Sequence, residues 1–156
     1  MSCFRALAQK TDSLQAPYKR FPTPPPFTLL LSDSTTRFTK AQLQKKPLLL
    51  MLFSPECSHC QHMAEELVQY KEEIKGIQVV MATLHPLWQM NAFVEKYQLR
   101  SVPELVIGKD VAYLLPSFYG IKNLPYTALY ERKGNLISTF EGGMPVKKAL
   151  ALLNTK

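Results

Sequence analysis

Cysteine and histidine side chains are concentrated in one short stretch of the sequence. Cys57 and Cys60 form a Cys-x-x-Cys pair, with His59 between them and His62 two residues beyond. A cysteine thiolate attacks disulfide sulfurs, and a second cysteine nearby can resolve the mixed disulfide that forms. Thiolates and imidazoles also bind zinc and copper. The stretch therefore indicates either thiol–disulfide exchange or metal binding.

The residues around the pair predict a strand followed by a helix. Residues 48–53 form a continuous apolar run, which is typical of a strand buried on both faces. Apolar residues then recur at helical spacing from Cys60 to Val68, and we expect this helix to end near Gly76. Cys57 would precede the first turn, where unpaired backbone N–H groups and the helix dipole favour a thiolate. We therefore expect Cys57 to be the nucleophile, and Cys60, on the apolar face, to be the resolving cysteine.

The rest of the chain predicts an α/β domain preceded by an arm. Residues 9–26 are polar and contain five prolines, so we expect neither a helix nor a paired strand there. We assign Met63 and Trp88 to core packing. Apolar periodicity and turn residues predict these further elements: a hairpin over 27–31 and 36–38, a strand over 77–82, a helix over 87–97, a strand over 104–107 closed by Gly108, a hairpin over 127–131 and 136–140, and a helix over 146–153.

This order of elements resembles the thioredoxin superfamily, and the insert before Pro125 is similar to that of the TlpA/ResA branch. The resemblance covers residues 27–153. It implies a thioredoxin-like fold: a central mixed sheet flanked by helices, with an N-terminal hairpin and a βα insert before a cis-proline. In that family the cis-proline faces the cysteines, and the backbone of its neighbour pairs with extended substrate. The resemblance therefore implies that Leu124 and Pro125 bind substrate.

The sequence departs from the family at positions that matter for chemistry. Thioredoxin has an acidic residue six positions before the first cysteine, and Met51 stands there in this chain. Glu56 replaces the usual aromatic residue, and Glu65 replaces the usual helix proline. The usual proton acceptor for Cys60 is therefore missing. Glu56, His85 and water remain as alternatives.

The two residues between the cysteines, with Glu56 before them, are expected to tune the redox potential. Ser58 and His59 place an imidazole beside Cys60, which is similar to protein disulfide isomerase and DsbA. A positive charge or donor there stabilises the Cys57 thiolate and makes the disulfide more oxidising, whereas Glu56 acts in the opposite direction. Potentials in the superfamily run from about −270 mV for thioredoxin to about −120 mV for DsbA. We expect an intermediate to oxidising value.

Length, composition and charge set limits on the other function classes. The chain has 156 residues, a length typical of one domain, which we place at residues 27–156 after an arm at 1–26. Its net charge of +7 is scattered along the sequence, without a basic helix or an RNA-binding motif. No apolar run approaches the length of a membrane span. We therefore expect a monomer with no nucleic-acid partner and no stable membrane insertion.

The arm contains a pattern relevant to export. Residues 6–8 read Ala-Leu-Ala and precede Gln9, which matches the small-x-small pattern of a signal peptidase site. The arm is then either the remnant of an export signal or an accident of composition. Export would favour the periplasm, and the alternative is the cytoplasm.

Together these features predict a thiol-disulfide oxidoreductase that needs no cofactor. Its substrates would be proteins carrying a disulfide or a dithiol, while the redox partner and the direction of electron flow stay open. One alternative is a thioredoxin-like protein that delivers copper or zinc. However, the position of His62 on the helix makes it difficult for all four ligands to reach one ion. The other alternative is a non-catalytic interaction module, against which the intact cysteine pair argues.

Overall fold

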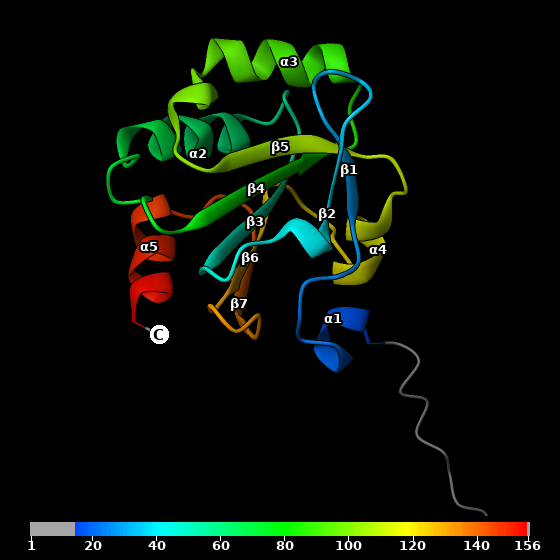
Figure 1. Ribbon diagram of the computed structural model, residues 1–156, viewed down its shortest axis with the longest axis vertical. Helices are drawn as coiled ribbons and strands as arrows, with labels where there is room; N and C mark the ends of the chain where they lie inside the picture. The colour runs from blue at the N-terminus through cyan, green and yellow to red at the C-terminus, as the bar shows by residue number, and fades with distance from the viewer. Residues whose placement is uncertain (1–14, 156) are drawn as a thin grey trace, which may run out of the picture.

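The computed structural model describes residues 15–155, which form a layer of helices on each side of a seven-stranded sheet (Figure 1). The strand order is β2-β1-β5-β4-β3-β6-β7. The strands are β1 (Thr28–Leu30), β2 (Arg37–Thr39), β3 (Leu48–Phe53), β4 (Gln78–Thr83), β5 (Leu105–Asp110), β6 (Tyr126–Tyr130) and β7 (Leu136–Glu141). The helices are α1 (Pro17–Arg20), α2 (Ser58–Gln69), α3 (Leu87–Lys96), α4 (Leu114–Tyr119) and α5 (Val146–Asn154), with single 3₁₀ turns η2 (Lys40–Gln42) and η3 (Leu99–Ser101).

The sheet is mixed, as the sequence predicts. Strands β3, β4 and β5 run parallel and are joined through α2 and α3. The two predicted hairpins, β1–β2 and β6–β7, extend the sheet at opposite edges through antiparallel pairing. In the parallel register Phe53 lies opposite Thr83. The segments that follow β3 and β4 therefore leave the sheet side by side.

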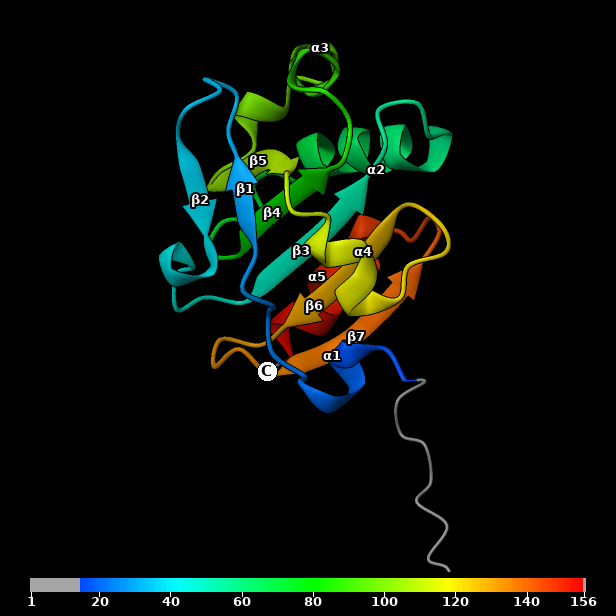
Figure 2. The same ribbon diagram turned by 90° about the vertical axis from the view of Figure 1, so that its right-hand side faces the viewer.

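Strand β3 contributes to two separate cores because successive side chains of a strand point to opposite faces. Leu49, Met51 and Phe53 join the core under α2, α3 and α5. The alternate residues of β3 join the core under α4 and α1. Figure 2 shows these helices on the two sides of the sheet. All six residues of β3 are buried, which explains its continuous apolar sequence. Among residues 15–155, no helix is long and apolar enough to cross a membrane.

The prolines of the arm do not exclude a helix, and that expectation was wrong for α1. Pro17 occupies its first position, where a missing N–H removes no helical hydrogen bond. The Tyr18 ring packs on Tyr119 of α4, with centroids 5.8 Å apart. The carbonyl of Pro22 accepts a hydrogen bond from the backbone N of Leu136, at 2.8 Å. The arm therefore contacts the domain at Tyr18 and Pro22, while the Ala-Leu-Ala pattern at 6–8 lies outside the described residues.

Two predicted boundaries also differ from the structure. Helix α2 ends at Gln69 rather than near Gly76, and successive turns over 70–76 place Ile74 in the core. Strand β5 continues past Gly108, which does not close it. A Cβ at Gly108 would lie 2.7 Å from the Cβ of Leu29. The glycine therefore permits the close approach of β1 to β5.

Candidate active site

Cys57 lies at the junction of β3 and α2, where the sequence places it. It is the N-cap residue of α2, and its Sγ accepts a hydrogen bond from the backbone N of Cys60 at 3.3 Å. The Cys57 side chain is half-buried, and its Sγ lies 3.6 Å from the carbonyl oxygen of Leu124. As a thiol, Cys57 donates to that carbonyl. As a thiolate, it would keep the backbone N–H of α2 as a stabilising donor.

Cys60 differs from Cys57 because it is fully buried. Its relative exposure is 0%, and it lies in the same core as Met51 and Met63. Burial, followed by the hydrogen bond to the Cys57 side chain, raises the pKa of the Cys60 thiol to about 12. Both cysteines are free thiols in the structure. The pair therefore combines an accessible sulfur with a protected thiol that stays protonated at neutral pH.

The Leu124–Pro125 segment reaches Cys57 through sheet pairing. Tyr126, which follows it, lies opposite Leu52 near the end of β3. The Leu124–Pro125 peptide bond is cis, and the Pro125 carbonyl accepts from the backbone N of Gly142 at 2.8 Å. The structure thus brings together two parts of the predicted site that are 67 residues apart in sequence.

Ser54 and His85 form a polar contact beside the cysteines that the sequence did not fully reveal. His85 Nε2 lies 3.0 Å from Ser54 Oγ, and its Nδ1 lies 2.7 Å from Gln89 Oε1. Because the Gln89 oxygen only accepts, Nδ1 carries a proton, and in the neutral imidazole Nε2 then accepts from the Ser54 hydroxyl. His85 was expected from the sequence as an alternative proton acceptor, whereas Ser54 was not. The sequence signal was their position. Ser54 directly follows β3, and His85 lies two residues after β4, which is the parallel neighbour of β3.

The predicted tuning residues lie on the exposed side of the pair. Glu56, Ser58 and His59 are all exposed, and the backbone N of Glu56 donates to Ser54 Oγ at 3.3 Å. The His59 ring rests against the backbone of Gly143, where a Cβ would be 3.1 Å from Nδ1. The glycine thereby allows the loop before α5 to approach the imidazole, which limits where the ring can move.

Comparison with known proteins places these features in a family. Residues 35–156 match the sequence profile of the thioredoxin-like domain. The chain belongs to the thioredoxin-like family. It is 30% identical over 108 residues to the thiol-disulfide oxidoreductase ResA of Halalkalibacterium halodurans, covering 66% of this chain. The chain spans only 58% of the length of that relative.

Solved structures of thioredoxin-like proteins share the fold. A secreted disulfide oxidoreductase of Mycobacterium tuberculosis, homologous to E. coli DsbE, superposes with a TM-score of 0.70 at 21% identity, covering 83% of this chain and 96% of the other. StoA of Bacillus subtilis gives a TM-score of 0.65 at 15% identity, covering 84% and 98%. The predicted relationship to thioredoxin-like proteins of the ResA type is confirmed.

The thioredoxin-like fold does not gather the ligands of the metal-delivery alternative. His62 Nδ1 lies 3.8 Å from Glu65 Oε2 on the exposed side of α2. Across residues 15–155, no group of three or more histidine, cysteine or acidic side chains is arranged to hold a metal ion. The geometry therefore gives this alternative no support.

Trp88, which we assigned to core packing from the sequence, lines a shallow groove beside the turn before Cys57. Trp88 is 69% exposed and does not belong to the core. It lines a cavity of about 200 Å³ between α3 and the turn at Pro55 and Glu56. Trp88 lies at the second position of α3, whereas the buried residues of that helix are Met90, Phe93 and Val94. The groove therefore offers an apolar surface beside the turn that precedes Cys57.

Proposed function

We propose that this thioredoxin-like protein exchanges dithiols and disulfides with protein substrates through Cys57 and Cys60. One observation carries the proposal: a half-buried sulfur caps the start of α2, and a fully buried thiol follows one helical turn later. This asymmetry suits a nucleophile and a resolving cysteine. The function of the ResA relative supports the same chemistry.

The proposed reaction proceeds in two exchange steps. The Cys57 thiolate attacks one sulfur of a substrate disulfide, forms a mixed disulfide and displaces the other sulfur as a thiolate. Cys60 then loses its proton and attacks Cys57 Sγ. The Cys57–Cys60 disulfide forms, and the second substrate thiolate leaves. The substrate gains two electrons and the pair loses two. The reverse sequence oxidises a substrate dithiol.

The second step requires a base for the Cys60 proton. Met51 cannot act as one, although it occupies the position of the thioredoxin acid. The Ser54 backbone acts against burial and lowers the pKa of the Cys60 thiol, and the Ser54 hydroxyl is hydrogen-bonded to His85 Nε2. We assign proton acceptance to this pair. His85→Ala should slow resolution about 100-fold, the low end for a lost general base, so that the mixed disulfide accumulates in mass spectra. Unchanged resolution would exclude this route.

The substrate is proposed to lie across Leu124, Pro125 and the groove at Trp88. The position of the Leu124 carbonyl beside Cys57 allows an extended chain to place its disulfide at Sγ. An apolar side chain near that disulfide would fill the groove. Trp88→Ala should therefore raise KM for apolar protein substrates and leave kcat unchanged.

Turnover of protein disulfides separates the enzyme from its alternatives. Insulin reduction should be catalysed by the Cys3→Ser variant, which retains the active pair, and should be abolished by adding Cys57→Ser. Adding Cys60→Ser instead should trap the mixed disulfide. Absence of turnover in the Cys3→Ser variant, the parent of these variants, would favour a non-catalytic module. Stoichiometric, tight uptake of copper or zinc would favour metal delivery.

The reduction potential tests the tuning residues and bears on the direction of exchange. Equilibration with glutathione should give a value between about −270 and about −120 mV. His59→Ala should lower the potential, because the imidazole no longer supports the Cys57 thiolate. His62→Ala is the matched control, since His62 is exposed on the same helix and should leave the potential unchanged. A potential that stays equal or rises in His59→Ala contradicts the role of His59.

We further propose that the protein acts as a monomer outside the cytoplasm. The Ala-Leu-Ala pattern and the secreted relative of Mycobacterium tuberculosis support export. A membrane-impermeant thiol reagent applied to intact cells should label Cys57. Labelling only after lysis would place the protein in the cytoplasm. Light scattering should give the mass of one chain.

A further inference from the structure

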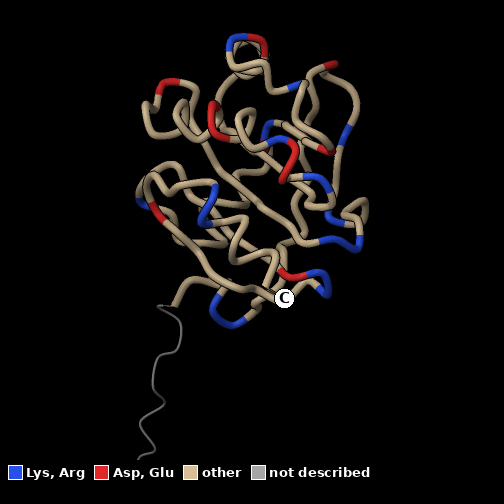
Figure 3. The backbone as a smooth tube through the Cα atoms, turned by 90° about the vertical axis from the view of Figure 1, so that its left-hand side faces the viewer, with Lys and Arg blue, Asp and Glu red and all other residues tan. Residues whose placement is uncertain are grey.

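Lysine and arginine side chains that are scattered in sequence meet at the end of the sheet opposite the cysteines. Residues from the segment before β3 and from the β6–β7 turn line one cleft of about 190 Å³. Its cationic residues are Lys40, Lys45, Lys46, Arg132 and Lys133. Figure 3 shows blue segments gathered at this end of the molecule, near the C-terminus label. The clustering arises because Leu48, the first residue of β3, pairs with Tyr130, the last of β6.

The lining holds five cations and one carboxylate, Glu131, whose charge its neutral hydrogen-bond partner does not cancel. Glu104 forms an ion pair with Lys46, and Glu131 accepts a hydrogen bond from the Asn135 amide. Four of the five cations of the cleft therefore have no carboxylate partner within the described chain. Like charges held together this way favour an anionic ligand.

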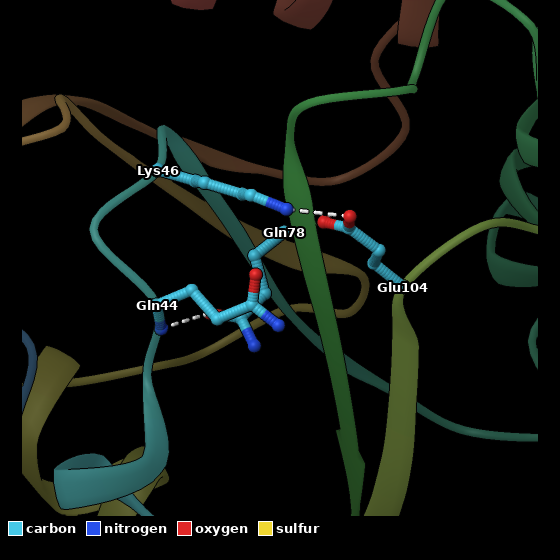
Figure 4. A network of polar contacts seen from close by, with 4 residues as sticks. All are labelled: Gln44, Lys46, Gln78 and Glu104. Atoms are coloured by element: carbon cyan, nitrogen blue, oxygen red, sulfur yellow. Dashed lines mark hydrogen bonds and ion pairs between the residues drawn. The ribbon is translucent and has the colours of Figure 1, made fainter.

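The backbone that carries these cations is fixed by hydrogen bonds. The backbone N of Gln44 donates to Gln78 Oε1 at 2.9 Å, and Figure 4 shows this contact beside the Lys46–Glu104 pair. In the opposite wall, the backbone N of Glu131 donates to the Asn135 carbonyl at 2.9 Å. The cations are therefore presented by two ordered loops, so little loop ordering is needed on binding.

The lining of the cleft favours one class of partner. Its cationic part is exposed at Lys45, Arg132 and Lys133, and its accessible apolar part is the half-buried Leu43, since Leu48 and Pro24 are buried. A phosphate ester joined to a hydrocarbon chain matches both parts. The aromatic ring in the lining, Tyr130, is 1% exposed and offers no face on which a nucleic-acid base could stack.

We propose that this cleft binds the phosphate head groups of an anionic membrane surface. The binding is peripheral and needs no inserted segment. The six residues of β3 separate the cleft from the Cys57 loop by about 17 Å, at about 3.3 Å per residue. With the cleft on the membrane, the cysteines face away from it and remain open to proteins in solution. This inference goes beyond the proposed function and does not depend on it.

Vesicle sedimentation tests the proposal. The protein should bind vesicles of phosphatidylcholine mixed with phosphatidylglycerol but not vesicles of phosphatidylcholine alone, and added salt should release it. Each cation near an anionic surface contributes about fivefold to binding, so Lys45→Gln with Lys133→Gln should weaken it about 30-fold. The matched control is Lys147→Gln with Lys148→Gln, which removes the same charge from the start of α5.

Several outcomes overturn the proposal. Equal weakening in both double variants would mean that net charge alone drives binding. Glycerol phosphate, hexaglutamate and duplex DNA are tested as alternative ligands. If one of them binds and the Lys45 and Lys133 substitutions weaken that binding, while phosphatidylglycerol vesicles do not bind, the cleft is a site for that ligand instead. Insulin reduction by the cleft variant should equal that of the parent. If the parent itself does not reduce insulin, the proposed thiol chemistry is refuted, but the result of the vesicle assay is unaffected.

Discussion

The difference between the two sulfurs predicts a large difference in alkylation. In a variant with Cys3→Ser and Cys57→Ser, Cys60 is the remaining thiol. Burial, the largest cause of its raised pKa of about 12, persists in that variant. At pH 8 such a thiol is ionised to about one part in 10,000, whereas an exposed cysteine with a pKa of about 8.5 is ionised to about one quarter. Iodoacetamide reacts with the thiolate. Because Cys57→Ser removes the Cys57 contributions to that pKa, roughly 2,000-fold is the upper limit of the slowing expected for folded Cys60 relative to an exposed thiol.

Mass spectrometry of samples quenched over time measures this ratio. The same variant in urea supplies the reference for an exposed thiol, and circular dichroism confirms that the native sample is folded. A second variant, with Cys3→Ser and Cys60→Ser, should react at Cys57 in the folded state, because that side chain is half-buried at the surface. Alkylation of folded Cys60 within tenfold of the urea rate would refute the assignment of Cys60 as the protected thiol.

Three further predictions concern the fold that holds the site. Gly108→Ala should lower the free energy of unfolding in urea by about 2 kcal/mol, because the new Cβ would overlap Leu29; a neutral effect would show that β1 shifts freely. Glu66→Ala should cost about 1 kcal/mol in the same assay, because Glu66 Oε2 accepts from the backbone N of Val146 at 3.1 Å and caps α5; no loss would mean that water replaces the carboxylate. Burial raises the pKa of Tyr126 from its ordinary value of 10.0 to about 12 in the folded protein. The contribution of the neutral phenol to stability is therefore complete below pH 10 and is lost as the pH rises toward 12. Thermal melts of Tyr126→Phe should be less sensitive to that pH range than those of the parent.

The elements next to the cysteines were predictable because their signals are local. Six apolar residues in succession define β3, and a helical period that includes Cys60 defines α2. The end of the helix was set at Gly76 because glycine commonly follows the last turn of a helix, which is why the sequence overestimates the length of α2. The chain leaves the helix at Tyr70, and the turns that follow bury Ile74 in the core. This ending depends on tertiary packing, which the local sequence does not reveal.

The contacts that complete the site depend on strand pairing and were less accessible from sequence. Ser54 and His85 are 31 residues apart, and their contact follows from the parallel register of β3 and β4. The resemblance to thioredoxin supplied Pro125, since spacing alone gives no reason to place it at Cys57. No local pattern marks the basic cleft, because its lysines come from segments that are paired only at Leu48 and Tyr130.

Met51 stands where thioredoxin has an acidic residue, and it lies in the same core as Cys60. This replacement affects both the stability of the core and the proposed deprotonation of Cys60. A carboxylate at that position would be buried, and the cost of burying a charge would fall on the folded state. Met51 removes that cost and fills the core around Cys60 with apolar atoms. The same apolar surroundings disfavour the Cys60 thiolate. The packing that stabilises the fold would therefore slow the second step of the proposed exchange. This is the physical reason for our proposal that Ser54 and His85, at the polar edge of this core, accept the proton of Cys60.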